Sequence, residues 1–444
     1  MKKWHWILLG AVVAVWMFPA LIIIAPVVMV LGFPVYFIWY RLSSTAADGK
    51  LFAAIADGNI TEVKRLLSRS MFYKMASPNA ANGDGVTALT FSVRKGNTAI
   101  TKVLLDKEAD IHAVSKSGET ALLAAAEVGN VEAAGLLLDK GADIKAANEA
   151  GKTVLMLAQS HMELFRFLLE RGADINAADK TGETSLMLAV KKKNIEAAKL
   201  LLDKGANANA ANNDSETALL LAVESKNIEA VKLLLDKGAD TNAANKKSET
   251  ALLTAIEMGT TEAAALLLDR GADINARNGA GKTALVRAVE MKNIEAARLL
   301  LDRGADINAA NEAGNAALLL RALSSGSVEM LKLLLEHGAD ANADDDKGVP
   351  ALMLALNNMD MFKLLLEKGA DINAADAQGQ TPLVKAMKAK NMKAINLLLE
   401  LGANLDVARD GGELLALAAK NNDMELARRL VNMGVDPQAA TQGA

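Results

Sequence analysis

One short pattern recurs through most of the chain, and this repetition limits the possible folds more than any other feature. Most intervals between copies are 33 residues, and with degenerate copies near Gly49 and Glu413 the chain holds about twelve units. Such a period is typical of solenoids, in which each unit packs only on its neighbours. The slot filled by Thr217 in Thr217-Ala218-Leu219 is filled elsewhere by Thr87, Thr120, Thr153, Thr184, Thr250, Thr283, Ala316, Pro350 and Thr381.

Each unit has the pattern of two short helices. In the copy at Thr217, a first helix over 218–223 is small and apolar, and Lys226-Asn227 makes a turn. A second helix over 228–237 ends at Gly238, a residue suited to the left-handed position after a helix. The pattern predicts an all-α solenoid of about twelve helix pairs. The apolar residues at helical spacing on one face of the second helix are Ile228, Val231, Leu234 and Leu235.

These units resemble the ankyrin repeat over residues 48–437. The stretches that carry the resemblance are Gly379-Gln380-Thr381-Pro382-Leu383, Leu233-Leu234-Leu235 and Gly271-Ala272-Asp273-Ile274-Asn275-Ala276. The resemblance implies an ankyrin-repeat solenoid that binds proteins on the side formed by its loops and the ends of its first helices.

Two departures from the family pattern affect local contacts. Apolar residues replace the family histidine, so we expect apolar contacts in place of its hydrogen bonds; they are Leu123, Met156, Leu220, Leu253 and Val286. Ser215 and Ser248 replace the family glycine, so the loop turns at these two positions could differ from the others.

The segment before the repeats has the pattern of a membrane anchor. No charged side chain occurs from Ile7 to Tyr40, a run too long for the apolar core of a cleaved signal peptide. We expect an anchor over 1–41, a linker over 42–47, the repeat domain over 48–437 and a loose tail over 438–444. The anchor forms either one kinked transmembrane helix or a re-entrant hairpin. Residues expected at the membrane interface are Trp4, Trp6, Trp39, Tyr40, Arg41, Phe72 and Tyr73.

An anchor followed by such repeats resembles bacterial ankyrin proteins, which implies a single-pass protein of the inner membrane. Lys2 and Lys3 on one side nearly balance Arg41 and Lys50 on the other, so the charges leave the orientation open. The short, doubly basic N-terminus resembles an uncleaved signal anchor, which favours repeats on the periplasmic side.

Several kinds of chemistry are not expected. The net charge is only −4, which gives no basic field for nucleic acid. There is no cysteine, and the four histidines are far apart in sequence, so we expect no metal site. The stretch 279–283 lacks the first glycine of a phosphate-binding loop, because that position is Ala276. We therefore expect no enzyme, no cofactor and no small-molecule substrate.

The candidate partner-binding residues are acidic and occupy two repeating slots. One slot directly precedes the repeat threonine and the other ends the first helix. They form either a solvated surface or a groove for a basic or polar segment of a protein partner whose identity is unknown. The favoured function is a membrane-tethered scaffold that holds or inhibits a partner, in an accessory, stress or immunity-type role. The alternative is a structural or channel-forming membrane component assembled as an oligomer. The residues are Glu119, Glu127, Glu183, Glu216, Glu224, Glu249, Glu257 and Glu290.

Overall fold

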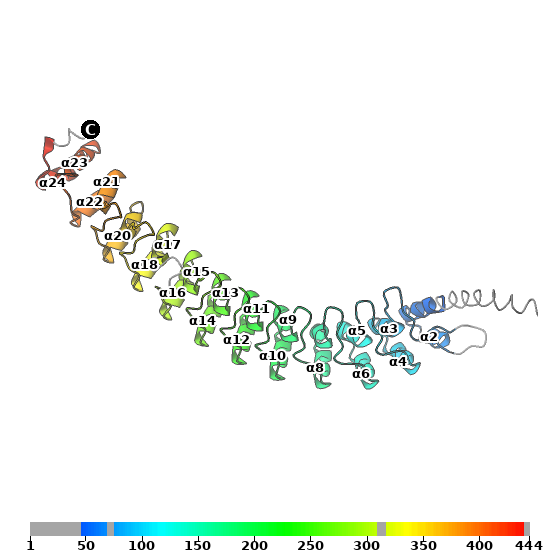
Figure 1. Ribbon diagram of the computed structural model, residues 1–444. Coiled ribbons are helices and arrows are strands. Elements are labelled where there is room, and N and C mark those ends of the chain that lie inside the picture. The colour runs from blue at the N-terminus through cyan, green and yellow to red at the C-terminus, as the bar shows by residue number, and fades with distance from the viewer. Residues whose placement is uncertain (1–45, 69–74, 309–316, 439–444) are drawn as a thin grey trace, which may run out of the picture. The chain divides into compact units, whose positions relative to one another are not determined.

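The computed structural model describes residues 46–68, 75–308 and 317–438, and within these ranges the chain forms twelve helix pairs joined by loops (Figure 1). The extended segments described there make only isolated bridges, such as the one between Ala211 and Thr217. The prediction of an all-α solenoid of about twelve units is therefore confirmed.

The first pair consists of a helix over residues 46–56 and α2. This helix includes residues 46 and 47, the last two of the segment expected as a linker over 42–47. The first helices of the following pairs are α3 (Ala88–Arg94), α5 (Ala121–Val128), α7 (Val154–Leu157) with the 3-10 turn η1 (Ala158–Ser160), α9 (Ser185–Lys191), α11 (Ala218–Glu224), α13 (Ala251–Glu257), α15 (Ala284–Glu290), α17 (Ala317–Ser325), α19 (Ala351–Leu354), α21 (Pro382–Lys388) and α23 (Gly411–Lys420).

The second helices share a length of seven to nine residues. They are α2 (Ile60–Leu66), α4 (Thr98–Asp106), α6 (Val131–Asp139), α8 (Met162–Glu170), α10 (Ile195–Asp203), α12 (Ile228–Asp236), α14 (Thr261–Asp269), α16 (Ile294–Asp302), α18 (Val328–Glu336), α20 (Met359–Glu367), α22 (Met392–Glu400) and α24 (Met424–Asn432).

Capping residues set where these helices begin and end. The Thr217 hydroxyl accepts a hydrogen bond from the Leu220 amide at 3.4 Å, at the first turn of α11. Asn227 caps α12 in the same way, by accepting from the Ala230 amide at 3.1 Å. Such caps satisfy amides that have no partner within the helix. Gly238 follows α12 at φ 78°, as its sequence position predicts.

The two helices of a pair are buried to different extents. In α11 every residue from Ala218 to Val223 is at most 4% exposed, because this helix lies between neighbouring pairs. In α12 Val231 and Leu234 are fully buried, while Glu229 is exposed. Full burial of one leucine side chain stabilises a fold by about 1.5–3 kcal/mol. The repeated leucines of the second helices therefore hold each pair against the next.

Hydrogen bonds between loops add to this stacking. The side-chain oxygen of Asn209 accepts from the Asp240 amide of the next repeat at 2.8 Å. Asn242 binds the Asp273 amide in the same way, at 2.7 Å. The family-histidine slot holds buried apolar side chains, such as Leu220 at 1% exposure, so apolar contact there is confirmed.

The two serine turns do not differ from the glycine turns. Ser215 and Ser248 adopt φ 62° and 58°, in the left-handed region that Gly281 occupies with φ 70°. The Ser215 amide donates to the Asn212 carbonyl at 2.9 Å, and the Gly281 amide makes the same bond to Asn278 at 2.8 Å. The suggestion that these turns could differ was wrong, because the surrounding hydrogen bonds hold the serine backbone in the glycine conformation.

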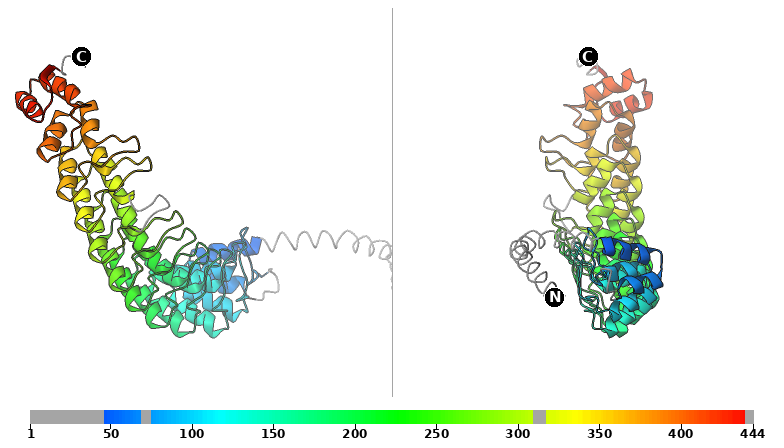
Figure 2. Two further views of the ribbon diagram at one scale, coloured as in Figure 1. Left: turned by 60° about the vertical axis from the view of Figure 1, so that its left-hand side comes forward. Right: turned by 90° about the vertical axis from the view of Figure 1, so that its right-hand side faces the viewer.

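The helix pairs belong to two compact units. Unit 1 comprises residues up to 189 together with 203–206, and unit 2 comprises residues 190–202 and those from 207 onward. Within unit 2 the loops between repeats project on one side of the helix layers (Figure 2). We call the side of each unit that carries these loops and the ends of the first helices the loop face.

The predicted anchor over 1–41, with its interface residues, lies outside the described residues, as do Phe72, Tyr73 and residues 439–444 of the expected tail. Within the described ranges, no helix has both the length and the apolar character needed to cross a membrane. The domain limits of the N-terminal segment therefore stay predictions.

Candidate functional site

The two charged slots lie close together on the loop face because a tight turn fixes the first of them. The Asn212 side-chain oxygen accepts from the amides of Asp214 and Glu216, both at 2.9 Å. This turn places Glu216 directly before the threonine that caps the first helix. The second slot, Glu224, ends that helix eight residues later.

In unit 1, a single arginine joins two of the predicted glutamates. Arg94, at the end of α3, lies 2.7 Å from the Glu119 carboxylate and 3.7 Å from that of Glu127, both in the next repeat. The Glu119 side chain is only 8% exposed, and its second carboxylate oxygen has no hydrogen-bond partner. Hydrogen bonding to Glu119 raises the pKa of Arg94 above its ordinary value. Glu119 is therefore a buried ion-pair residue and not part of a solvated surface.

Glu183 occupies the first slot of the last repeat that begins in unit 1. Its side chain is partly buried, and its backbone amide donates to the Asp179 carboxylate at 3.0 Å. Asp179 thus forms the same turn here as Asn212 forms in unit 2.

In unit 2, another arginine joins a second pair of glutamates. Arg287 of α15 lies 2.8 Å from the Glu257 carboxylate and 3.8 Å from that of Glu249, both in the preceding repeat. Glu249 is 16% and Arg287 22% exposed at the side chain, so this ion pair is largely shielded from water.

Glu290 is also paired within unit 2. Its carboxylate lies 2.9 Å from the Lys282 ammonium of the same repeat and 2.5 Å from the Arg321 guanidinium of the next. With an exposure of 18% it is mostly enclosed by these two cations. Glu290 is therefore neutralised within the protein.

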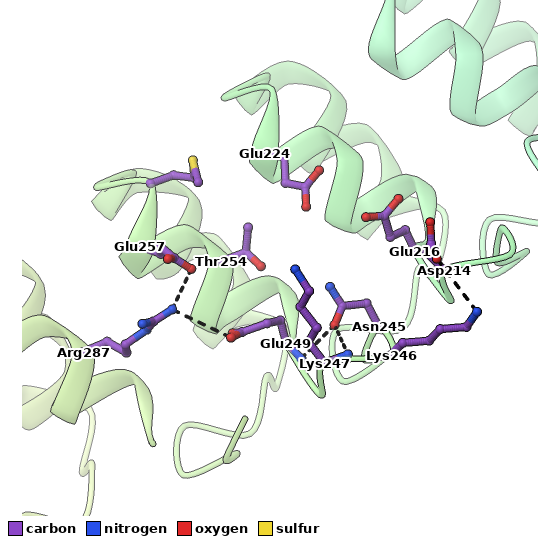
Figure 3. A pocket seen from close by; sticks show the side chains of 11 residues that line it. Asp214, Glu216, Glu224, Asn245, Lys246, Lys247, Glu249, Thr254, Glu257 and Arg287 are labelled. Atoms are coloured by element: carbon purple, nitrogen blue, oxygen red, sulfur yellow. Dashed lines mark hydrogen bonds and ion pairs between the residues drawn. The ribbon is translucent and has the colours of Figure 1, made fainter. Parts of the chain in front are cut away.

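Glu216 and Glu224 differ from all of these. The Glu216 carboxylate accepts from the Asn212 amide group at 2.8 Å, but neither glutamate has an ion-pair partner within 4.0 Å among the described residues. Both border a cavity of about 580 Å³ on the loop face (Figure 3). Burial and repulsion from Glu216 raise the pKa of Glu224, while Lys191 and Lys247 oppose this increase.

The described residues contain no cluster of three or more histidines, aspartates and glutamates that could hold a metal ion. The residues that sequence reasoning missed are the arginines Arg94, Arg287 and Arg321, which decide which glutamates remain open. Aligning the repeats and reading each cation against the acidic slots of its neighbours would have found them.

The match to a protein-family model agrees with this architecture. The family model described as ankyrin repeats (3 copies) matches residues 51–148, 108–179, 155–245, 239–311, 308–376 and 357–441. Among solved structures, the chain is similar to the ankyrin repeat domain of Bcl-3, a member of the IkappaB protein family. The identity is 33%, the alignment covers 50% of this chain and 100% of that chain, and the TM-score is 0.44. A search of curated proteins gave no significant match.

Proposed function

Because the chain belongs to the ankyrin-repeat family, we propose that it is a scaffold without catalytic activity, which binds a protein partner through its loop face and holds or inhibits it at a membrane surface. The observation that carries this proposal is the open acidic pair of Glu216 and Glu224, beside a cavity of about 580 Å³. A partly desolvated charge without a counter-ion is unfavourable in the free protein, and a complementary charge on a partner would relieve it.

The predicted site residues contribute unequally to such a surface. Glu216 and Glu224 are open to a partner, and we assign them the central role. Glu249 and Glu257 hold Arg287 at the cavity, whereas Glu290 pairs with Lys282 and Arg321 outside its lining. Glu119 and Glu127 are joined by Arg94 in unit 1, which leaves them a lesser role.

The membrane tether rests on the sequence of the first 41 residues. A run without charge from Ile7 to Tyr40 is long enough to cross the roughly 30 Å hydrocarbon core of a bilayer, and tryptophans stand near both of its ends. In this proposal the anchor crosses a bacterial inner membrane once, and the repeat domain lies on the periplasmic side.

Affinity capture with the full chain in membranes tests the scaffold. We expect a protein partner to be recovered, and we expect its recovery to fall when Glu216 and Glu224 are changed to lysine. The matched control changes Glu229 and Glu295 to lysine, because both are exposed on second helices and neither lines the cavity. Equal recovery by the two variants would contradict binding through the loop face.

Protease treatment of sealed vesicles tests the tether. Repeats on the periplasmic side are digested only when that side is accessible to the protease. Digestion from the cytoplasmic side would reverse the proposed orientation, and a full-length chain that remains soluble without detergent would exclude the anchor. Single-channel conductance from the reconstituted chain would favour the alternative channel component over a scaffold.

A further inference from the structure

Three repeats carry a glutamate at both loop-face slots, and one of these three pairs lacks the arginine that joins the other two. In each, the two glutamates are eight residues apart and lie on the same side of the first helix. The three pairs are Glu119 with Glu127, Glu216 with Glu224, and Glu249 with Glu257.

In two of these repeats the protein supplies its own arginine. Arg94 reaches forward from the preceding repeat, and Arg287 reaches back from the following one. Each guanidinium lies within 2.8 Å of one carboxylate and within 3.8 Å of the other. A planar guanidinium with donors on several sides suits two carboxylates better than a lysine ammonium does.

Neither position supplies an arginine to Glu216 and Glu224. The slot equivalent to Arg94 holds Lys191, and the slot equivalent to Arg287 holds Thr254. Lys191 is near enough to lower the pKa of Glu224 electrostatically, but a lysine ammonium lacks the planar set of donors with which a guanidinium spans two carboxylates. Thr254 is several atoms shorter than arginine, so the volume that Arg287 fills one repeat later is left as open cavity.

The cavity also exposes an unused hydrogen-bonding group. Thr254 is 7% exposed, and its hydroxyl has no hydrogen-bond partner among the described residues. Figure 3 shows this side chain between Glu224 and Glu257, with its oxygen turned into the pocket. A hydroxyl in the wall of a cavity that has no protein partner can form a hydrogen bond with a polar ligand entering that cavity.

The charges around the cavity favour a cation. Five carboxylates and three cations line it, a balance of −2 if all are ionised. Of the three cations, Lys246 lies 3.8 Å from Asp214 and Arg287 is held by its two glutamates. Lys247 is the remaining cation, and it forms no ion pair within 4.0 Å among the residues described. Among the lining cations, Glu216 and Glu224 therefore face only the exposed Lys247 without an ion pair of its own.

We propose that Glu216, Glu224 and Thr254 form a receptor for one arginine side chain of the protein partner, which takes the place that Arg94 and Arg287 fill in the other two repeats. This inference rests on the proposed function and narrows it to a partner with an exposed arginine. The partner's guanidinium spans the two carboxylates, and the Thr254 hydroxyl accepts one of its remaining hydrogens.

The test uses the full chain in detergent with ¹³C-labelled methionine methyl groups, because Met258 lines the cavity. The probe is N-acetyl-arginine amide, and the uncharged citrulline analogue is its control. We expect a saturable shift of the Met258 methyl signal with the arginine probe alone. The variant Glu216→Gln with Glu224→Gln should weaken binding at least tenfold, while Glu229→Gln with Glu295→Gln should leave it unchanged.

A second variant fills the site from within. Thr254→Arg puts an arginine in the slot that Arg287 occupies one repeat later, so it should bridge Glu216 and Glu224 and abolish probe binding while the helical circular dichroism is kept. Equal binding of the citrulline probe would overturn the proposal, as would arginine binding that survives the double glutamine change.

The probe titration needs no partner, so it separates this inference from the proposed function. Partner capture that persists in Thr254→Arg, with no saturable probe binding to the unaltered chain, would overturn the arginine receptor and leave the scaffold intact. Probe binding that depends on Glu216 and Glu224, in a chain that captures no protein, would support the receptor chemistry and refute the scaffold.

Discussion

A methyl group added at Gly129 would collide with the next repeat, which makes Gly129→Ala a sharp test of the stacking in unit 1. Gly129 ends α5 at φ 74°, and a Cβ atom placed there would lie 2.4 Å from Nδ1 and 2.5 Å from Cγ of His161. The other ring nitrogen of His161 lies 3.1 Å from the Glu127 carbonyl oxygen. The imidazole therefore covers the glycine and contacts the end of the same helix.

Gly96 provides a matched control, because it occupies the same turn one repeat earlier. Its φ is 70°, and no atom lies within 4 Å of a Cβ built there. Alanine in this left-handed conformation costs roughly 1–2 kcal/mol, and the lower entropy of its unfolded chain returns about 0.5–1 kcal/mol. We therefore expect Gly96→Ala to destabilise by about 0.5–1 kcal/mol.

Gly129→Ala carries the same backbone cost and an added steric one. Moving the His161 ring out of a packed position costs about 1–3 kcal/mol, and losing its hydrogen bond to the Glu127 carbonyl costs about 0.5–1.5 kcal/mol. The expected excess over Gly96→Ala is about 1.5–4.5 kcal/mol, which corresponds to a roughly 10- to 2000-fold change in an opening equilibrium.

Hydrogen exchange of the full chain followed by mass spectrometry is the appropriate assay, because a repeat array opens locally and a single melting temperature does not describe it. Amides of α5 and α6 should lose protection in Gly129→Ala, and those of α3 and α4 should lose far less in Gly96→Ala. In a His161→Ala background, Gly129→Ala should cost no more than Gly96→Ala does. Equal effects of the two alanine substitutions, or an excess that persists without the imidazole, would refute the steric argument.

Three further changes test single features of the fold. Ser215→Gly should stabilise the loop by about 0.5–1 kcal/mol, because glycine adopts φ 62° without strain; unchanged urea unfolding would contradict this. Hydrogen bonds from the amides of Gln380 and Gln378 lower the pKa of Asp376, so its contribution to stability is present above about pH 4 and is lost as the pH falls through the folded value. In Asp376→Asn, unfolding should therefore depend less on pH below about pH 4, and an unchanged acid profile would show that the bonds do not act this way. The pKa of Glu224 is raised, so its ionised carboxylate destabilises the folded chain at neutral pH. Glu224→Gln should therefore stabilise the chain at neutral pH and lose this advantage in acid; thermal melts at both pH values check this.

Helix positions were predictable from the sequence because most first helices begin after a threonine and most second helices after an asparagine. The first helix expected over 218–223 extends over Ala218–Glu224, and the second, expected over 228–237, ends at Asp236. Threonine and asparagine caps act on amides a few residues away, so the local sequence is enough to place them.

The exposure of the glutamates was not predictable in the same way. Glu119 and Glu216 both precede a repeat threonine, yet one is buried against Arg94 and the other borders a cavity. The difference comes from side chains about 25–40 residues away, at slots that reach across to a neighbouring repeat. The register between repeats decides which cation meets which carboxylate, so a glutamate read within its own repeat alone does not reveal its exposure.

A repeat array can keep an uncompensated acidic pair where a single-core domain would lose more stability. Each repeat contacts only its neighbours, so the cost of the repulsion between Glu216 and Glu224 is confined to the repeats around α11. The buried leucines of the other pairs are unaffected by it. Thr254 occupies the position that Arg287 holds in the next repeat. A threonine in place of arginine at this position leaves the acidic pair open and does not alter the backbone that carries it. Binding specificity can therefore change at one repeat while the fold is preserved by the rest.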